Sequence, residues 1–232
     1  MAQRRFLLAA VLTLLGTAGA GSADVIHRWS FNGDPSDSVG GADAILMGGA
    51  SVDGSQLQLD GVDSYAVLPI GDDLLNLTNC AFEGWVTWNR TPVDAWERIF
   101  DFGNDTVENM FLTPRNGNNG RVRFSITIDG GGDEEQTTSG YHFPTGTEVH
   151  FAVVINADYG INTLYLNGLP AAVTYGNMLT PYVFDTPMMN NYLGKSQYND
   201  PYFMGSINEF RVYNAALSDD DVYNSYLAGP DA

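Results

Sequence analysis

The stretch Gly205-Ser-Ile-Asn-Glu-Phe-Arg-Val-Tyr-Asn-Ala-Ala-Leu-Ser218 predicts a strand followed by the start of a helix. Strict alternation puts Ile207 and Glu209 on one face of this strand and Phe210 and Val212 on the other. Phe210 and Val212 can enter a core, whereas the charged face can pair with neighbouring strands. The segment therefore predicts a closing strand of a sheet with one apolar face.

The end of the same stretch predicts the start of a helix, and no long helical period appears earlier in the mature chain. Ser218 is followed three residues later by Asp221, a spacing typical of a capping box at a helix N-terminus. We expect a short helix that ends near Tyr226.

The first 23 residues have the pattern of a secretory signal peptide. Arg4 and Arg5 precede the apolar run Phe6–Leu15, and small residues follow, with Ala20 or Ala23 as the last residue before cleavage. The apolar run is shorter than the roughly 20 residues of a spanning helix, which disfavours a membrane anchor. The mature protein is therefore expected to be secreted, periplasmic or at the cell surface, with no membrane span.

Charge and cysteine content exclude some classes of function. The formal charge is −18, the loss of Arg4 and Arg5 would make it two units more negative, and Lys195 is the only lysine. Nucleic-acid binding needs clustered basic residues, so it is excluded. The acidity is explained either by solubility or by carboxylates that hold Ca²⁺. Cys80 is the only cysteine, so no intrachain disulfide forms, and we expect it to be buried.

The rest of the chain has an all-β pattern. Short strand-like segments recur between Gly, Asn, Asp and Pro, and residues 121–129 alternate most clearly. Large aromatics lie on both faces of residues 80–88, so one face should meet a second sheet and the other should line a partly covered concavity. No linker or internal repeat interrupts residues 24–228, which we interpret as one domain with a short tail at 229–232.

Seven segments together resemble the LamG-like jelly-roll domains of the concanavalin A-like lectin/glucanase superfamily. These segments are His27-Arg-Trp29-Ser-Phe31-Asn, Leu57-Gln-Leu59-Asp60-Gly61-Val-Asp63-Ser-Tyr65, Phe82-Glu-Gly-Trp85-Val86, His150-Phe-Ala-Val153, Leu164-Tyr165-Leu166-Asn167-Gly168, Leu193-Gly194 and Gly205 to Leu217. Their order and spacing identify the fold better than any one of them. The resemblance implies a two-sheet antiparallel jelly-roll sandwich.

The resemblance leaves three functions open. It implies a non-catalytic module that binds a glycan or another surface ligand, a glycoside hydrolase or polysaccharide lyase with an atypical site, or a structural and adhesive matrix protein. The glucanase branch carries Glu-x-Asp-x-x-Glu on one strand, which places two carboxylates about 5 Å apart. This chain lacks that array. Glu83, with Asp101 on a following strand, is the fallback catalytic pair.

A structural calcium ion is also implied by the resemblance, between the end of the first strand and the last strand. Relatives usually carry Asp at the last-strand position, where this chain has Asn208. Asp34 and Glu209 could supply the missing charge, because Ca²⁺ prefers oxygen ligands. The alternative is that Asp34 only stabilises a turn. The three histidines are dispersed, which favours structural roles over a zinc site.

Sugar binding needs an aromatic surface beside hydrogen-bonding side chains. One loop supplies both in Tyr198, Asn199, Asp200 and Tyr202, and Trp96 beside a glutamate and an arginine is a second candidate. The alternative is that these aromatics cover the edge of the core. The acidic loop Gly130 to Glu135 we interpret as a solvated turn.

Overall fold

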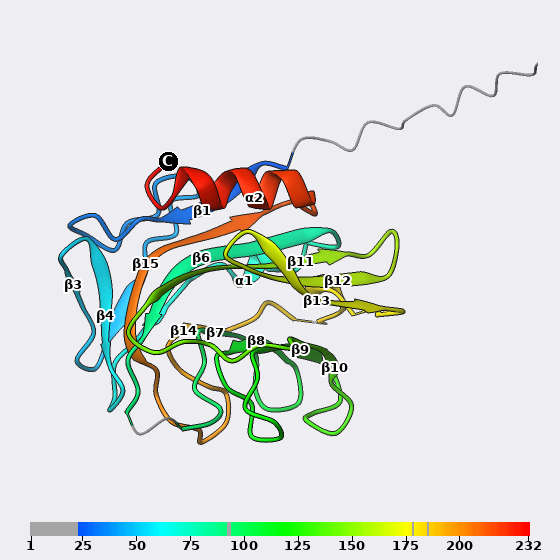
Figure 1. The fold of residues 1–232 in the computed structure, drawn as a ribbon, viewed down its shortest axis with the longest axis horizontal. Helices are drawn as coiled ribbons and strands as arrows, with labels where there is room; N and C mark the ends of the chain where they lie inside the picture. Colours follow the sequence, from blue (N-terminus) through cyan, green and yellow to red (C-terminus); the bar gives the residue numbers. More distant parts are fainter. Residues whose placement is uncertain (1–22, 92–93, 178, 185) are drawn as a thin grey trace, which may run out of the picture.

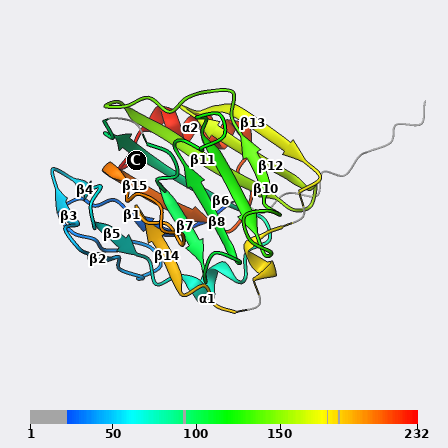
Figure 2. The ribbon, with the colours of Figure 1, turned by 90° about the horizontal axis from the view of Figure 1, so that it is seen from below.

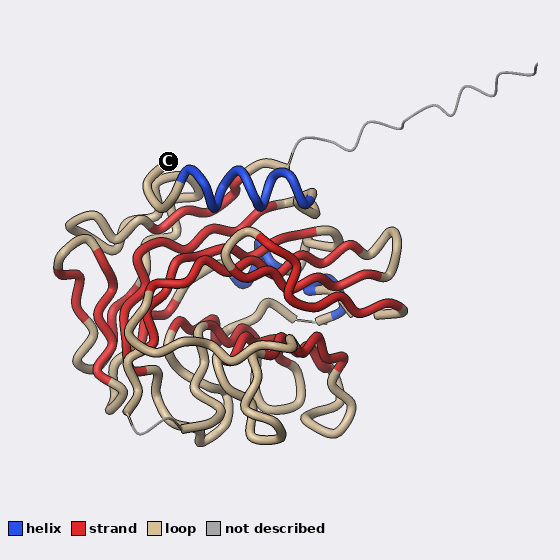
Figure 3. The backbone as a smooth tube through the Cα atoms, in the orientation of Figure 1, coloured by secondary structure: helices blue, strands red, loops and turns tan. Residues whose placement is uncertain are grey.

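The computed structural model describes residues 23–232, except 92–93, 178 and 185. In this part of the chain, 15 strands form two antiparallel sheets that pack face to face (Figure 1; Figure 3). The all-β sandwich expected from the sequence is therefore confirmed. The expected signal peptide falls, apart from Ala23, outside the described residues.

The first sheet, sheet A, has eight strands, in the order β13-β12-β11-β6-β15-β4-β3, with β1 paired to β15. Three long strands from distant parts of the chain lie at its centre. Of these, β6 pairs antiparallel with β11 on one side and with β15 on the other. The strands of sheet A are β1 (Val25–Trp29), β3 (Ser51–Asp53), β4 (Gln56–Asp60), β6 (Cys80–Trp88), β11 (Glu148–Asn156), β12 (Ile161–Leu166), β13 (Leu169–Tyr175) and β15 (Met204–Tyr213).

The second sheet, sheet B, has seven strands, in the order β10-β9-β8-β7-β14-β5-β2 (Figure 2). Its central strands are short and joined by the loops that gather below it in Figure 1. The strands of sheet B are β2 (Ile45–Met47), β5 (Tyr65–Val67), β7 (Phe100–Gly103), β8 (Asn109–Thr113), β9 (Arg123–Thr127), β10 (Glu135–Thr138) and β14 (Asn190–Leu193).

Aromatic side chains fill the space between the sheets. Phe82 and Phe210 of sheet A meet Phe100 and Phe102 of sheet B, with ring centroids 5.5 to 5.9 Å apart. All four are fully buried, and each such side chain contributes about 1.5–3 kcal/mol relative to exposure. Because side chains alternate along a strand, the neighbours of these phenylalanines point away from the core, onto the outer faces of the sandwich.

The closing strand β15 departs from strict alternation. Its pairing with β6 shifts register between Ile207 and Glu209, which is a β-bulge at Asn208. The extra residue lets Ile207 join Phe210 in the core, so the expectation that Ile207 and Glu209 share a face is wrong. The second residue of this strand, Gly205, must be small, because a Cβ there would lie 2.0 Å from the Thr87 carbonyl oxygen.

The outer face of sheet A is covered by helix α2 (Asp219–Ala228), which is drawn above that sheet in Figure 1. Ser218 and Asp221 form the expected capping box. Val222 of the helix is buried with Ala81 and Tyr213 of the strands beneath. The second face of β6 therefore does not line a concavity, contrary to expectation. The shorter helices are α1 (Gly71–Leu74) and the 3₁₀ turn η1 (Pro181–Val183). No helix in the described ranges is long and apolar enough to span a bilayer.

Candidate functional site

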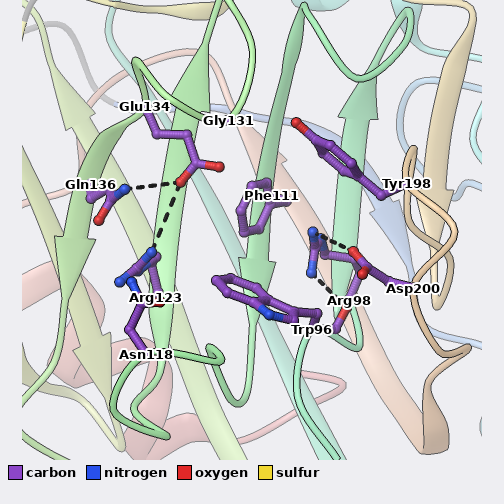
Figure 4. A pocket seen from close by; sticks show the side chains of 10 residues that line it. All are labelled: Trp96, Arg98, Phe111, Asn118, Arg123, Gly131, Glu134, Gln136, Tyr198 and Asp200. Atoms are coloured by element: carbon purple, nitrogen blue, oxygen red, sulfur yellow. Dashed lines mark hydrogen bonds and ion pairs between the residues drawn. The ribbon is translucent and has the colours of Figure 1, made fainter.

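A cavity of about 280 Å³ opens on the outer face of sheet B (Figure 4). Its floor comes from outward-facing positions of β8 and β9, and its walls come from four loops and from β10. We call it the outer-face pocket. The residues that line it are Trp96, Arg98, Phe111, Asn118, Arg123, Gly131, Glu134, Gln136, Tyr198 and Asp200.

Trp96 is held in a strained backbone conformation at the edge of this pocket. Its φ of 71° lies in the left-handed region, which is rare for a bulky residue. The Trp96 N–H donates to the Arg115 carbonyl oxygen at 2.8 Å. A Cβ at Gly117 would lie 2.5 Å from the indole Nε1, so this glycine lets the turn approach the ring closely. The surrounding contacts thus fix a conformation that the residue would not adopt alone.

Arg98 joins two walls of the pocket to its floor. Its guanidinium lies 3.9 Å from the centroid of the Phe111 ring. It donates to Asp200 at 2.9 Å and to Asp101 at 3.3 Å, and the residue is only 2 % exposed. The ion pair with Asp200 positions the loop that contains this aspartate. The stacking of the guanidinium on Phe111 supports the aromatic surface of the pocket.

Asp101 lies directly behind Arg98 and is fully buried. Burial raises the pKa of Asp101 to about 7, although the charge of Arg98 and the N–H of Gln197 oppose this rise. Its Oδ1 has no hydrogen-bond partner within the described ranges. The carboxyl group is therefore poised to change its protonation state near neutral pH.

On the opposite side of the pocket, Arg123 of β9 faces Glu134 of the loop before β10. Arg123 lies against Trp96, 5.7 Å from the ring centroid, and its Nε donates to Thr138 at 3.0 Å. Its Nη1 lies 4.0 Å from Oε2 of Glu134. Gln136 donates to the same oxygen at 3.1 Å. The interpretation of residues 130–135 as a solvated turn holds at Gly131, which is an exposed turn residue, but is wrong at Glu134, whose side chain is only 9 % exposed and lines the pocket.

Only some of the candidate residues in the loop after β14 lie in the pocket. Tyr198 and Asp200 line the pocket, and the Tyr198 hydroxyl donates to the Thr106 carbonyl oxygen at 2.8 Å. Asn199 is exposed and does not line the pocket. Tyr202 packs instead against Tyr65, with ring centroids 6.0 Å apart. The structure therefore brings together Trp96, Tyr198 and Asp200 from the predicted set.

Glu83 and Asp101 do not form a pair. Phe82 packs against Phe100 and Phe102 inside the sandwich, so Glu83 and Asp101 point outward from opposite sheets. Glu83 accepts hydrogen bonds from the Tyr213 hydroxyl and, at 2.8 Å, contacts His150 beneath α2.

Burial alone would raise the pKa of Glu83, but the contacts with His150, Tyr213 and Arg211 hold that pKa below its usual value. Glu83 is thus an ionised carboxylate of a buried network.

The residues predicted for calcium have other partners. Asp34 is exposed and accepts from the Ser36 N–H at 2.9 Å. Asn208 donates to Glu148 at 2.9 Å. Glu209 is bound by the guanidinium groups of Arg28 and Arg211. This arrangement does not fit a calcium site at these three residues. Within the described ranges, no group of three or more His, Cys, Asp or Glu side chains is placed to hold a metal ion.

A family model described as the concanavalin A-like lectin/glucanases superfamily matches residues 60–223. The chain belongs to this superfamily. The match confirms the resemblance inferred from the sequence segments and agrees with the two-sheet jelly roll. A comparison with curated proteins found no match.

Three solved structures have folds similar to that of this chain. Domain 4 of AbnA, a GH43 extracellular arabinanase from Geobacillus stearothermophilus solved with arabinotriose, has a TM-score of 0.72 and 22% identity, over 87% of this chain and 98% of that chain. The CBM40 of the Ruminococcus gnavus IT-sialidase, bound to α2,3-sialyllactose, has a TM-score of 0.57 and 17% identity, over 66% and 84%. The binding domain of botulinum neurotoxin serotype D has a TM-score of 0.68 and 14% identity, over 88% and 52%. At these identities the similarity shows the fold alone.

Proposed function

We propose that this chain is a carbohydrate-binding module and that its glycan ligand occupies the outer-face pocket. The observation that carries the proposal is the strained Trp96, held beside Phe111, Tyr198 and a set of polar side chains in one cavity. Strained conformations of bulky residues persist where neighbouring contacts enforce them, and they cluster at ligand sites.

The chemistry of the pocket suits a sugar ring. A pyranose or furanose has apolar C–H surfaces and a rim of hydroxyl groups, so it needs aromatic contact and hydrogen-bonding groups together. Trp96 and Tyr198 supply aromatic surface, and Glu134, Gln136 and Asp200 supply polar atoms. A volume of about 280 Å³ is close to the lower end of small-molecule pockets, so we infer room for one or two sugar rings.

The structural neighbours support this class of ligand. Two of them are described with a bound saccharide, arabinotriose in one and sialyllactose in the other. We further propose that residues 1–23 are a secretory leader and that the module meets its glycan outside the cytoplasm. Sequencing the N-terminus of the protein recovered from the medium or periplasm of a producing cell would test this leader.

Retention on glycans tests the proposed function. The mature chain should be retained by at least one glycan on an array or by an insoluble polysaccharide. Trp96→Ala should weaken that binding about 30-fold, because a central aromatic in a binding site commonly contributes about 2 kcal/mol.

The matched control is Tyr175→Ala, a tyrosine that is 73 % exposed on edge strand β13 of the other sheet. Its affinity should equal that of the unmodified protein. Retention should also persist with a calcium chelator, because Asp200 and Glu134 already face arginines. A chain that binds no glycan, or a Trp96→Ala variant with unchanged affinity, would refute the proposal.

A further inference from the structure

The side chain of Glu134 presents an oxygen that the protein itself does not use. Its Oε2 accepts from Gln136 and faces Arg123, whereas its Oε1 accepts no hydrogen bond from the described part of the chain. The side chain is only 9 % exposed. Figure 4 shows Oε1 directed toward the centre of the pocket. A carboxylate oxygen that faces a cavity and has no donor from the protein takes its hydrogen bond from water or from a ligand.

The charges that line the pocket are paired with one another. Arg98 faces Asp200 and Arg123 faces Glu134, so the two cations and two anions of the lining cancel. Both arginines are almost fully buried, and each lies over an aromatic ring. No cation of the lining is therefore left without an anion to receive a carboxylate or sulfate from a ligand.

We propose that the outer-face pocket selects a neutral, hydroxyl-rich saccharide and that Glu134 Oε1 accepts a hydrogen bond from one of its hydroxyl groups. This inference rests on the proposed function. A hydroxyl group can donate to a free carboxylate oxygen, and such charge-assisted bonds are stronger than neutral ones. An anionic sugar at the same place would put like charges together.

The net charge of the whole chain also favours a neutral ligand. The formal charge is −18, which repels a polyanionic glycan before it reaches the pocket. This repulsion does not act on a neutral ligand, so the affinity for such a ligand should change little with salt concentration. An anionic ligand would bind more tightly at higher salt, because salt screens the repulsion.

Two ligand panels and one pair of variants test the proposal. The probes are neutral oligosaccharides of arabinose, xylose, glucose, galactose or mannose, and anionic ones that contain uronic acid, sulfate or sialic acid. We expect the unmodified protein to prefer the neutral panel at least 10-fold, with less than about 2-fold change in affinity between low and moderate salt.

Glu134→Gln should weaken binding of the preferred neutral ligand about 10-fold or more, because the free acceptor loses its charge. The control is Asp133→Asn, which makes the same charge change at the exposed neighbouring residue and should leave affinity unchanged. Melting temperatures establish that both variants are folded.

The outcomes separate the two proposals. If neither panel binds, the proposed function fails and this inference fails with it. If the protein binds glycans but prefers anionic ones, or if Glu134→Gln binds as tightly as Asp133→Asn, the function stands and the inference about Glu134 is overturned. The panel preference is measured on the unmodified protein, so it decides the ligand class even where a variant does not fold.

Discussion

Trp96 combines a strained backbone conformation with a place in the lining of the outer-face pocket. Its positive φ disfavours every residue except glycine, and the contacts with Arg115 and Gly117 compensate for the strain. The sequence shows an aromatic residue beside charged ones, but not that the backbone is forced to present it. Stability and binding should therefore respond differently to substitutions at this position.

Comparison of Trp96→Gly with Trp96→Ala separates the two effects. Both variants lose the indole, so both should lose glycan affinity. Glycine adopts φ of 71° without strain, and we expect Trp96→Gly to be more stable than Trp96→Ala by about 1 kcal/mol. Urea unfolding measures this difference. Equal stabilities, or a more stable alanine variant, would show that the left-handed conformation is not enforced in the folded protein.

Asp101 should make stability depend on pH. Burial raises its pKa from 3.8 to about 7 in the folded chain. Between about pH 4 and pH 7 the folded state therefore holds a proton that the unfolded state has lost, so the free energy of unfolding falls as pH rises through this window.

Asp101→Asn cannot ionise, so its fall in stability over this window should be smaller than that of the unmodified protein. Thermal melts at half-unit pH steps measure the slopes. The exposed Asp133→Asn serves as the control and should keep the original slope. Parallel slopes for all three proteins would contradict the assignment to Asp101.

The two sheets use their outer faces differently. Helix α2 covers sheet A, where Glu83, His150 and Tyr213 form a buried network, whereas loops surround an open cavity on sheet B. The helix was predictable because Ser218 and Asp221 carry a local capping signal. The face that the helix covers was not predictable, because it depends on the packing of Val222 against residues far away in the chain.

Glu83→Gln tests the structural role of this network. Loss of the charge leaves His150 and Arg211 with a weaker partner beneath α2, so the free energy of unfolding should fall by about 1–3 kcal/mol. Glycan affinity should not change, because the pocket lies on the other sheet. Unchanged stability, or a loss of binding as large as that of Trp96→Ala, would contradict this role.

Across the chain, the sequence predicted the architecture better than the site. Alternation in β9 and the cap of α2 depend on local chemistry, so they are readable from residues alone. Trp96, Tyr198 and Asp200 were candidates from two separate loops, and the fold brings them into one cavity.

Arg123 and Glu134 were missed, because an outward arginine and an acidic loop look solvated until β9 and β10 pair. The bulge in β15 was missed because an extra residue in a strand leaves no sequence signal.

The central claim is that Trp96 contacts a glycan, and tryptophan indole N–H resonances test it most directly. The chain has four tryptophans, and the other three, Trp29, Trp85 and Trp88, are buried. The Trp96 resonance is assigned from the spectrum of Trp96→Phe. Titration with the oligosaccharide that binds best should shift this resonance most and leave the other three nearly unchanged. Saturation of binding without a shift of the Trp96 resonance would contradict the claim.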